Sequence, residues 1–134
     1  MSNALYAKGK EKILAGSINF GSDTIKAALV NSSYTPNLST DEFLSTISAY
    51  VLNTAQTLGS KTTTAGAFDA ADITYTAVTT GSTAKAVVLY KDTGSSATSP
   101  LLAYIDTITG FPLSTNGSDV VVQWDNGTYK IFSL

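Results

Sequence analysis

The sequence predicts a mainly β fold, an antiparallel β-sandwich or barrel with one or two short peripheral helices. Short runs rich in β-branched and aromatic residues recur along the chain, and turns rich in Gly, Ser, Thr and Asn separate them. The chain has 134 residues, of which 43% are hydrophobic, and no cysteine. That length is enough to bury one core without disulfides. We therefore expect residues 1–134 to form a single β-rich domain of about seven or eight strands.

The first segment, residues 3–15, predicts a short helix. Asn3 is a suitable N-cap, and Gly16 is suited to end the helix. Gly9 in the middle costs about 1 kcal/mol relative to Ala. The neighbouring lysines are interpreted as a solvated face. The apolar residues of the segment recur at helical spacing and are Leu5, Ile13 and Leu14.

A buried strand and a second helix are predicted next. Residues 24–30 form a β-branched, apolar run of strand length, and residues 31–37 collect loop-forming residues. Ser39 and Glu42 then have the spacing of a capping box, in which each side chain satisfies a backbone N–H at a helix start. We expect a short helix over residues 40–47, packed over one end or face of the sheet.

From residue 50 onward the pattern indicates strands, first over residues 50–57 and more weakly near 61–68. Residues 72–78 alternate apolar and polar side chains, and a short turn leads to the apolar run 84–90. We expect these two segments to pair as a hairpin. The strand predicted over residues 101–106 should lie beside residues 84–90.

The C-terminal region predicts a second hairpin. Residues 120–124 and 128–132 flank Asp-Asn-Gly, whose residues tolerate the positive φ of tight hairpin turns. Trp124 and Tyr129 lie close to this turn. Their rings could stack across the strands, a contact worth a few tenths to about 1 kcal/mol.

Composition argues against the commonest kinds of catalytic and metal site. The chain has no His and no Cys, the residues most often used for proton transfer near neutral pH, thiol chemistry and soft-metal binding. The acidic pairs Asp41–Glu42 and Asp69–Asp72 are explained by a helix start and a turn. Oxygen-rich loops lack the alternating acidic positions of a calcium loop. We predict no catalytic residue, no cofactor and no metal.

Charge and hydropathy also limit the partners. The net charge is −2, and the lysines form no basic patch beyond the short N-terminal group, so we expect no nucleic-acid partner. There is no apolar run of about 18 residues. We therefore expect no membrane partner, and the absence of cysteine fits synthesis in the cytoplasm.

Several segments together resemble a family of small tailed-bacteriophage proteins encoded among virion genes. The likeness runs over nearly the whole chain and is weakest over residues 50–61. Its motifs are signatures of helices, turns and strands, and none is chemical. The resemblance therefore implies a structural role in the virion rather than an activity. The segments are residues 3–16, 23–30, 89–94, 102–106, 109–112, 122–127 and 130–132.

We therefore expect a bacteriophage virion structural protein, made in the host cytoplasm and located in the virion. The leading hypothesis is a capsid decoration (cement) protein that binds the major capsid protein of the assembled head as a homo-oligomer, with a trimer preferred. Only 13% of the residues are charged, so surface can be buried against neighbours without desolvating many ions. The alternatives are a tail, baseplate or head–tail connection component, and a carbohydrate-binding adsorption module.

Six residues of the N-terminal helix, a loop and the C-terminal hairpin are candidate interface residues. Aromatic side chains are enriched at protein interfaces, and Tyr34 is expected to be a surface residue on a loop. Packing on the chain's own sheet is an equally good interpretation for Leu5 and Ile13. The six candidates are Leu5, Tyr6, Ile13, Tyr34, Trp124 and Tyr129.

Overall fold

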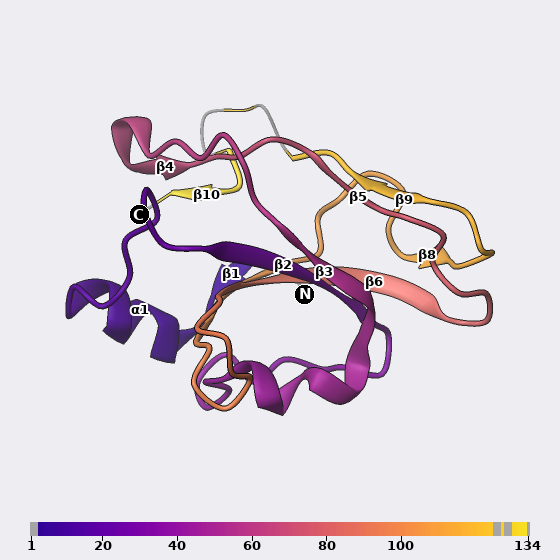
Figure 1. Cartoon of the computed structure of the whole chain (residues 1–134), viewed down its shortest axis with the longest axis horizontal. Helices are drawn as coiled ribbons and strands as arrows, with labels where there is room; N and C mark the ends of the chain where they lie inside the picture. Colours follow the sequence, from indigo (N-terminus) through magenta and orange to yellow (C-terminus); the bar gives the residue numbers. More distant parts are fainter. Residues whose placement is uncertain (1–2, 125–126, 128–129, 134) are drawn as a thin grey trace.

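The centre of the fold is a six-stranded antiparallel sheet (Figure 1). It is seen in a computed structural model that describes residues 3–124, 127 and 130–133. The strand order is β1-β7-β6-β2-β3, and β8 pairs with the first residues of β6. The strands are β1 (Ala4–Leu5), β2 (Ile25–Asn31), β3 (Val51–Thr57), β6 (Thr83–Lys91), β7 (Leu101–Ile105) and β8 (Leu113–Ser114).

Both faces of this sheet are buried. Along β2, Ala27 and Leu29 belong to one core cluster, and Ala28 and Val30 belong to a second. Successive side chains of a strand point to opposite faces. The continuous apolar run of β2 is therefore what a strand covered on both sides requires.

One face is covered by two small ribbons, which lie above the sheet in Figure 1. The first pairs β4 (Ala67–Phe68) with β10 (Phe132–Ser133), and the second pairs β5 (Ile73–Tyr75) with β9 (Val120–Val122). The hydroxyl of Tyr75 donates a 2.6 Å hydrogen bond to the carbonyl oxygen of Ala27. This bond fixes the second ribbon to the central sheet.

The other face is covered by the segment between β2 and β3 and by the loop after β6. The segment contains two short 3-10 helices, η1 (Leu44–Thr46) and η2 (Ser48–Tyr50), and η3 (Thr64–Gly66) precedes β4. Backbone hydrogen bonds join η1 to the loop at Ser96 and Ser99. The helix α1 (Ala7–Leu14) lies along β7 at the edge of the sheet.

The prediction of a mainly β, antiparallel fold is confirmed. The described part has ten strands, several of only two residues, against about seven or eight expected. The central sheet does not close into a barrel, because its strand order ends at β1 on one side and β3 on the other. The strands predicted near residues 24–30 and 50–57 are present as β2 and β3, and β6 pairs with β7 as expected.

The first helix is shorter than predicted, because its first residues form β1 instead. Tyr6 occupies the N-cap position and makes no side-chain capping hydrogen bond. Asn3, the predicted cap, accepts hydrogen bonds of 2.9 Å from the backbone N–H groups of Asp106 and Thr107. It therefore holds the start of the chain beside the end of β7. The predicted helix end is confirmed, with Gly16 at a left-handed φ of 78°.

The helix predicted over residues 40–47 is wrong, and η1 and η2 stand in this region instead. The side chain of Asn37 accepts a hydrogen bond from the N–H of Ser39 and forms a tight turn. Glu42, the predicted capping partner, instead accepts a 2.7 Å hydrogen bond from Nζ of Lys12 on α1. A tertiary ion pair has replaced the local cap.

The predicted hairpin of residues 72–78 with 84–90 is also wrong. β5 pairs with β9, while β6 lies between β2 and β7. The turn after β5 is held by Thr115, whose hydroxyl donates to the carbonyl oxygen of Thr79 at 2.6 Å. The chain thus leaves the ribbon and enters the central sheet at this point.

The C-terminal hairpin is not formed by the described residues. β9 pairs with β5, and β10 pairs with β4, so the two predicted partners belong to different ribbons. This arrangement buries Val120 and Val122 in the core. The turn residues 125–126 and 128–129 lie outside the described residues.

Candidate functional site

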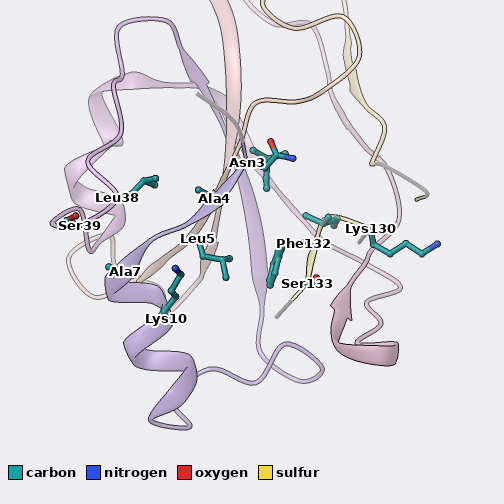
Figure 2. Close-up of a pocket in the computed structure, with 12 residues that line it drawn as sticks. Asn3, Ala4, Leu5, Ala7, Lys10, Leu38, Ser39, Lys130, Phe132 and Ser133 are labelled. Carbon is teal, nitrogen blue, oxygen red and sulfur yellow. The ribbon is translucent and has the colours of Figure 1, made fainter. Parts of the chain in front are cut away.

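A groove runs along the outer side of β1, between α1 and β10 (Figure 2). Its volume is about 630 Å³, which is in the range of pockets that hold small ligands. Three parts of the chain that are distant in sequence form its walls. The lining residues are Asn3, Ala4, Leu5, Ala7, Lys10, Leu38, Ser39, Ile105, Lys130, Ile131, Phe132 and Ser133.

The floor of the groove is an open strand edge. β1 pairs with β7 on one side, and the N–H of Tyr6 donates to the carbonyl oxygen of Leu102. Backbone groups alternate in direction along an antiparallel strand, so those of Leu5 point away from β7 and toward the groove. Within the described residues, no second strand pairs with β1. Leu5 therefore offers one backbone donor and one acceptor.

Apolar side chains extend the groove along α1. An adjoining hollow of about 370 Å³ is lined by Ile13 and Leu14 and shares Leu5, Lys10 and Ser133 with the groove. Leu14 is 88% exposed, the most exposed large hydrophobic side chain of the described chain. The hollow and the groove thus form one continuous, largely apolar surface.

The charge of the groove is positive. Lys10 and Lys130 line it, and no acidic side chain of the described residues does. In Figure 2, Lys10 reaches from α1 toward Leu5, whereas Lys130 lies beyond Phe132 and its side chain extends away from Leu5. No ion pair of either lysine is found among the described residues, whereas Lys12 pairs with Glu42.

Hydrogen bonds fix the walls of the groove. The N–H of Ala7, at the start of α1, donates to the carbonyl oxygen of Leu38 at 2.7 Å. The ammonium of Lys12 bonds to Glu42 at 2.7 Å and lowers the pKa of that carboxyl. These contacts join α1 to the 38–42 segment. The groove is therefore preformed rather than assembled from loose loops.

Behind the groove lies a buried chain of hydroxyl groups. The Tyr34 hydroxyl donates to Oδ2 of Asp41 at 2.7 Å, and the Tyr6 and Tyr34 oxygens are 2.7 Å apart. A phenol carries one proton, so Tyr6 is the donor to Tyr34. Burial is the main cause that raises the pKa of both phenols. Both stay protonated over the physiological range and serve the packing.

The six predicted interface residues do not form one surface. Leu5 and Ile13 line the groove and the adjoining hollow, where they also pack against the core. Tyr6 and Tyr34 are buried in the second core cluster, at 0% and 3% exposure, so the expectation that Tyr34 is a surface residue is wrong. The Tyr34 ring packs against the rings of Tyr50 and Tyr104.

The two C-terminal candidates do not form a described pair. Trp124 is 5% exposed, and its indole Nε1–H donates to the carbonyl oxygen of Ala71 at 3.0 Å. Its ring therefore belongs to the core. Tyr129 lies outside the described residues.

Sequence reasoning missed the charged part of the site. Lys10 was interpreted as solvated, together with the lysines on either side of it. The sequence does not distinguish Lys10 from Lys8 and Lys12. They differ in their ion pairs, since Lys8 pairs with Glu11 and Lys12 pairs with Glu42. Leu14 carried a weak signal as an apolar residue directly before the helix end.

A second hollow of about 650 Å³ lies between the end of β7 and the end of β9. Asp72, Asp106 and Gln123 give it a polar lining beside Trp124. Oδ1 of Asp72 accepts a 2.9 Å hydrogen bond from the N–H of Trp124, so this carboxylate serves to position the strand.

No family model and no curated protein matches this chain. In the described residues, no helix is long and apolar enough to cross a membrane. The same residues contain no group of three or more acidic side chains placed to hold a metal ion.

Proposed function

We propose that this chain is a structural protein of a tailed-bacteriophage particle that decorates the assembled head by binding the major capsid protein. The resemblance of its sequence to small virion proteins, over nearly the whole length, supports this role. Its composition is consistent with it, because the chain lacks the His and Cys that most often carry proton transfer near neutral pH and thiol chemistry.

The observation that carries the proposal is the open groove beside β1. This edge of the sheet opens onto apolar side chains that include the exposed Leu14, and apolar side chains of this kind form the buried centre of protein interfaces. In an assembled particle, this surface would be buried against neighbouring virion proteins.

Repetition strengthens such a contact. We propose a symmetric homo-oligomer, with a trimer preferred, that presents several copies of the groove to the shell. Linked copies gain affinity because binding of the first raises the effective concentration of the others. A modest groove on each copy is then sufficient for stable attachment.

A tail, baseplate or head–tail connection component is the alternative within the same class. It uses the same groove but occurs in few copies. A carbohydrate-binding module is a weaker alternative, because its aromatic platform needs exposed rings, and Trp124 is buried and hydrogen-bonded within the core.

The stoichiometry of purified particles tests the proposal. A decoration protein should be present at a copy number comparable with that of the major capsid protein, and a tail component at a few copies. Particles made without the gene should keep their form and lose resistance of the head to heat or low salt. Absence of the protein from mature particles would refute the virion role.

A further inference from the structure

We infer that the groove beside β1 binds an extended segment of another virion protein, which adds to the sheet as a strand and carries both apolar and acidic side chains. The inference rests on the proposed function for the source of the segment. Three features of the described residues support it, namely the free backbone of Leu5, the positive charge and the continuous apolar wall.

The backbone geometry selects an extended occupant. Leu5 presents one N–H and one C=O toward the groove, because it lies between Ala4, which pairs with Tyr104 of β7, and Tyr6, whose N–H donates to Leu102. An added strand satisfies both groups at once, which is the mode in which sheet edges bind extended peptides. A helix has no free backbone groups along its length to offer them.

The charge selects acidic side chains. Lys10 reaches toward Leu5, Lys130 lies at the far side of the groove, and among the described residues no acidic side chain lines it. By contrast, Lys12, Lys26 and Lys91 all have acidic partners within the chain. Carboxylates on the incoming segment would supply the missing partners. Charge complementarity of this kind sets partner choice more than it sets affinity.

The apolar wall selects the remaining side chains. Alternate residues of a strand point to one side, so every second side chain of the segment faces Leu5, Phe132 and the hollow at Ile13 and Leu14. Lys10 lines the same hollow as Leu14, so the apolar and acidic side chains of the best occupant belong to one face of the segment, at positions two residues apart. On that face the apolar side chains cover Leu14, and the carboxylates reach Lys10.

A peptide experiment tests the groove without any phage particle. The probes are two blocked peptides of equal length, a Val–Glu peptide that repeats Val-Ser-Glu-Ser and a Val–Lys peptide that repeats Val-Ser-Lys-Ser, so that the Val and the charged residues share one face. They are titrated into the isotope-labelled full chain, and backbone amide signals are followed by NMR. We expect the Val–Glu peptide to shift the amides of Leu5, Lys10 and Ser133, and the Val–Lys peptide to leave them unchanged.

Two variants of the chain sharpen this result. Lys10→Glu should abolish the shifts caused by the Val–Glu peptide. Lys85→Glu makes the same change of charge at a lysine outside the groove and should preserve them. No shifts, equal shifts from both peptides, or shifts confined to another surface would overturn the inference.

A second experiment uses particles of a phage that lacks the gene, assembled with each variant supplied from a plasmid. We expect Lys10→Glu to lower occupancy about tenfold or more, since a like charge opposes the segment, and Lys85→Glu to match wild type. If wild type and Lys10→Glu occupy particles equally, the groove inference fails while the virion role stands. If wild type is absent from particles, the virion role fails and the peptide result alone decides the groove.

Cross-linking identifies the occupant. The chain has no cysteine, so Ser39→Cys gives a single attachment point for a photoreactive probe at the groove, and Ser118→Cys gives one on the exposed far side. We expect the first to join an acidic, extended segment of another virion protein. Cross-links to a second copy of this chain, or the same cross-links from both positions, would overturn the inference.

Discussion

Gly9 and Leu101 bring the helix α1 and the strand β7 into direct backbone contact. A β-carbon placed on Gly9 would stand 2.6 Å from the carbonyl oxygen of Leu101, which is closer than real side chains approach. From the sequence, Gly9 is only a weak point in a helix, with a cost of about 1 kcal/mol. The contact explains the residue: only glycine lets α1 lie flat on the strand and form one wall of the groove.

The first prediction is that Gly9→Ala destabilises the chain by about 1–3 kcal/mol, because overpacking outweighs the better helix propensity of Ala. The clash is with backbone, which cannot move aside cheaply. Urea denaturation followed by circular dichroism measures the effect. Gly59→Ala is the matched control, since nothing lies within 4 Å of its β-carbon. A neutral or stabilising Gly9→Ala would contradict the close contact.

The second prediction concerns the hydroxyl chain behind the groove. Tyr34→Phe removes the oxygen that links the Tyr6 hydroxyl to Asp41, and it leaves a buried donor without its partner. We expect a loss of about 1–3 kcal/mol in the free energy of unfolding. Tyr50→Phe removes a hydroxyl that makes no hydrogen bond within the described residues and should cost less than about 0.5 kcal/mol. Equal effects of the two variants would refute the linking role.

The same tyrosines predict a loss of stability at alkaline pH. Burial raises the pKa of Tyr6, Tyr34 and Tyr75 in the folded chain, while a phenol in the unfolded chain has a pKa of about 10. Below that pH these phenols are protonated in both the folded and the unfolded chain, so they do not make the free energy of unfolding depend on pH. Above it the unfolded chain releases protons that the folded chain retains, so the free energy of unfolding falls as the pH rises.

Urea denaturation at neutral pH and at about pH 10.5 checks this third prediction. The fall should be smaller in Tyr34→Phe than in wild type, because one group with a raised pKa is missing. Stability that is constant or increases across this interval would contradict the burial of these phenols.

The sequence predicts a strand correctly where the strand's own apolar pattern shows that it is buried. β2 is apolar at five of its seven positions, including the unbroken run 27–30, as a strand covered on both faces requires. The β6–β7 pair is adjacent along the chain, so a short loop can join it. By contrast, β5 and β9 are about 45 residues apart, and their pairing depends on how the ribbons close over the sheet. No local pattern specifies such a partner.

In the candidate site, too, the sequence predicts some residues and misses others. Helical spacing selects both Leu5 and Ile13, but Leu5 lies in β1 and only Ile13 lies in the helix. Leu5 therefore reaches the groove from a strand, which the spacing does not predict. The sequence predicts a surface position for Tyr34 because its neighbours are loop-forming residues, whereas its ring packs against Tyr50 and Tyr104, which are distant in the sequence. Lys10 differs from Lys8 and Lys12 in that it forms no ion pair within the described residues, and only the folded arrangement reveals this difference.

The fourth prediction tests where the chain meets its partner. Leu14 and Val121 are the two large hydrophobic side chains that the described chain exposes most, at 88% and 52%, and they lie on different elements. Leu14→Gln keeps a helix-compatible side chain of similar length, and Val121→Thr keeps a β-branched one. Both side chains are largely in water, so each variant should change the free energy of unfolding by less than about 0.5 kcal/mol.

Their effects on assembly should differ. Leu14→Gln removes apolar area next to the groove and should lower occupancy of particles, whereas Val121→Thr should leave it unchanged because β9 lies on the far ribbon. Gel stoichiometry of particles made with each variant measures this. If Val121→Thr lowers occupancy and Leu14→Gln does not, the contact surface is the ribbon of β5 and β9, since a change in folding is excluded by the denaturation control.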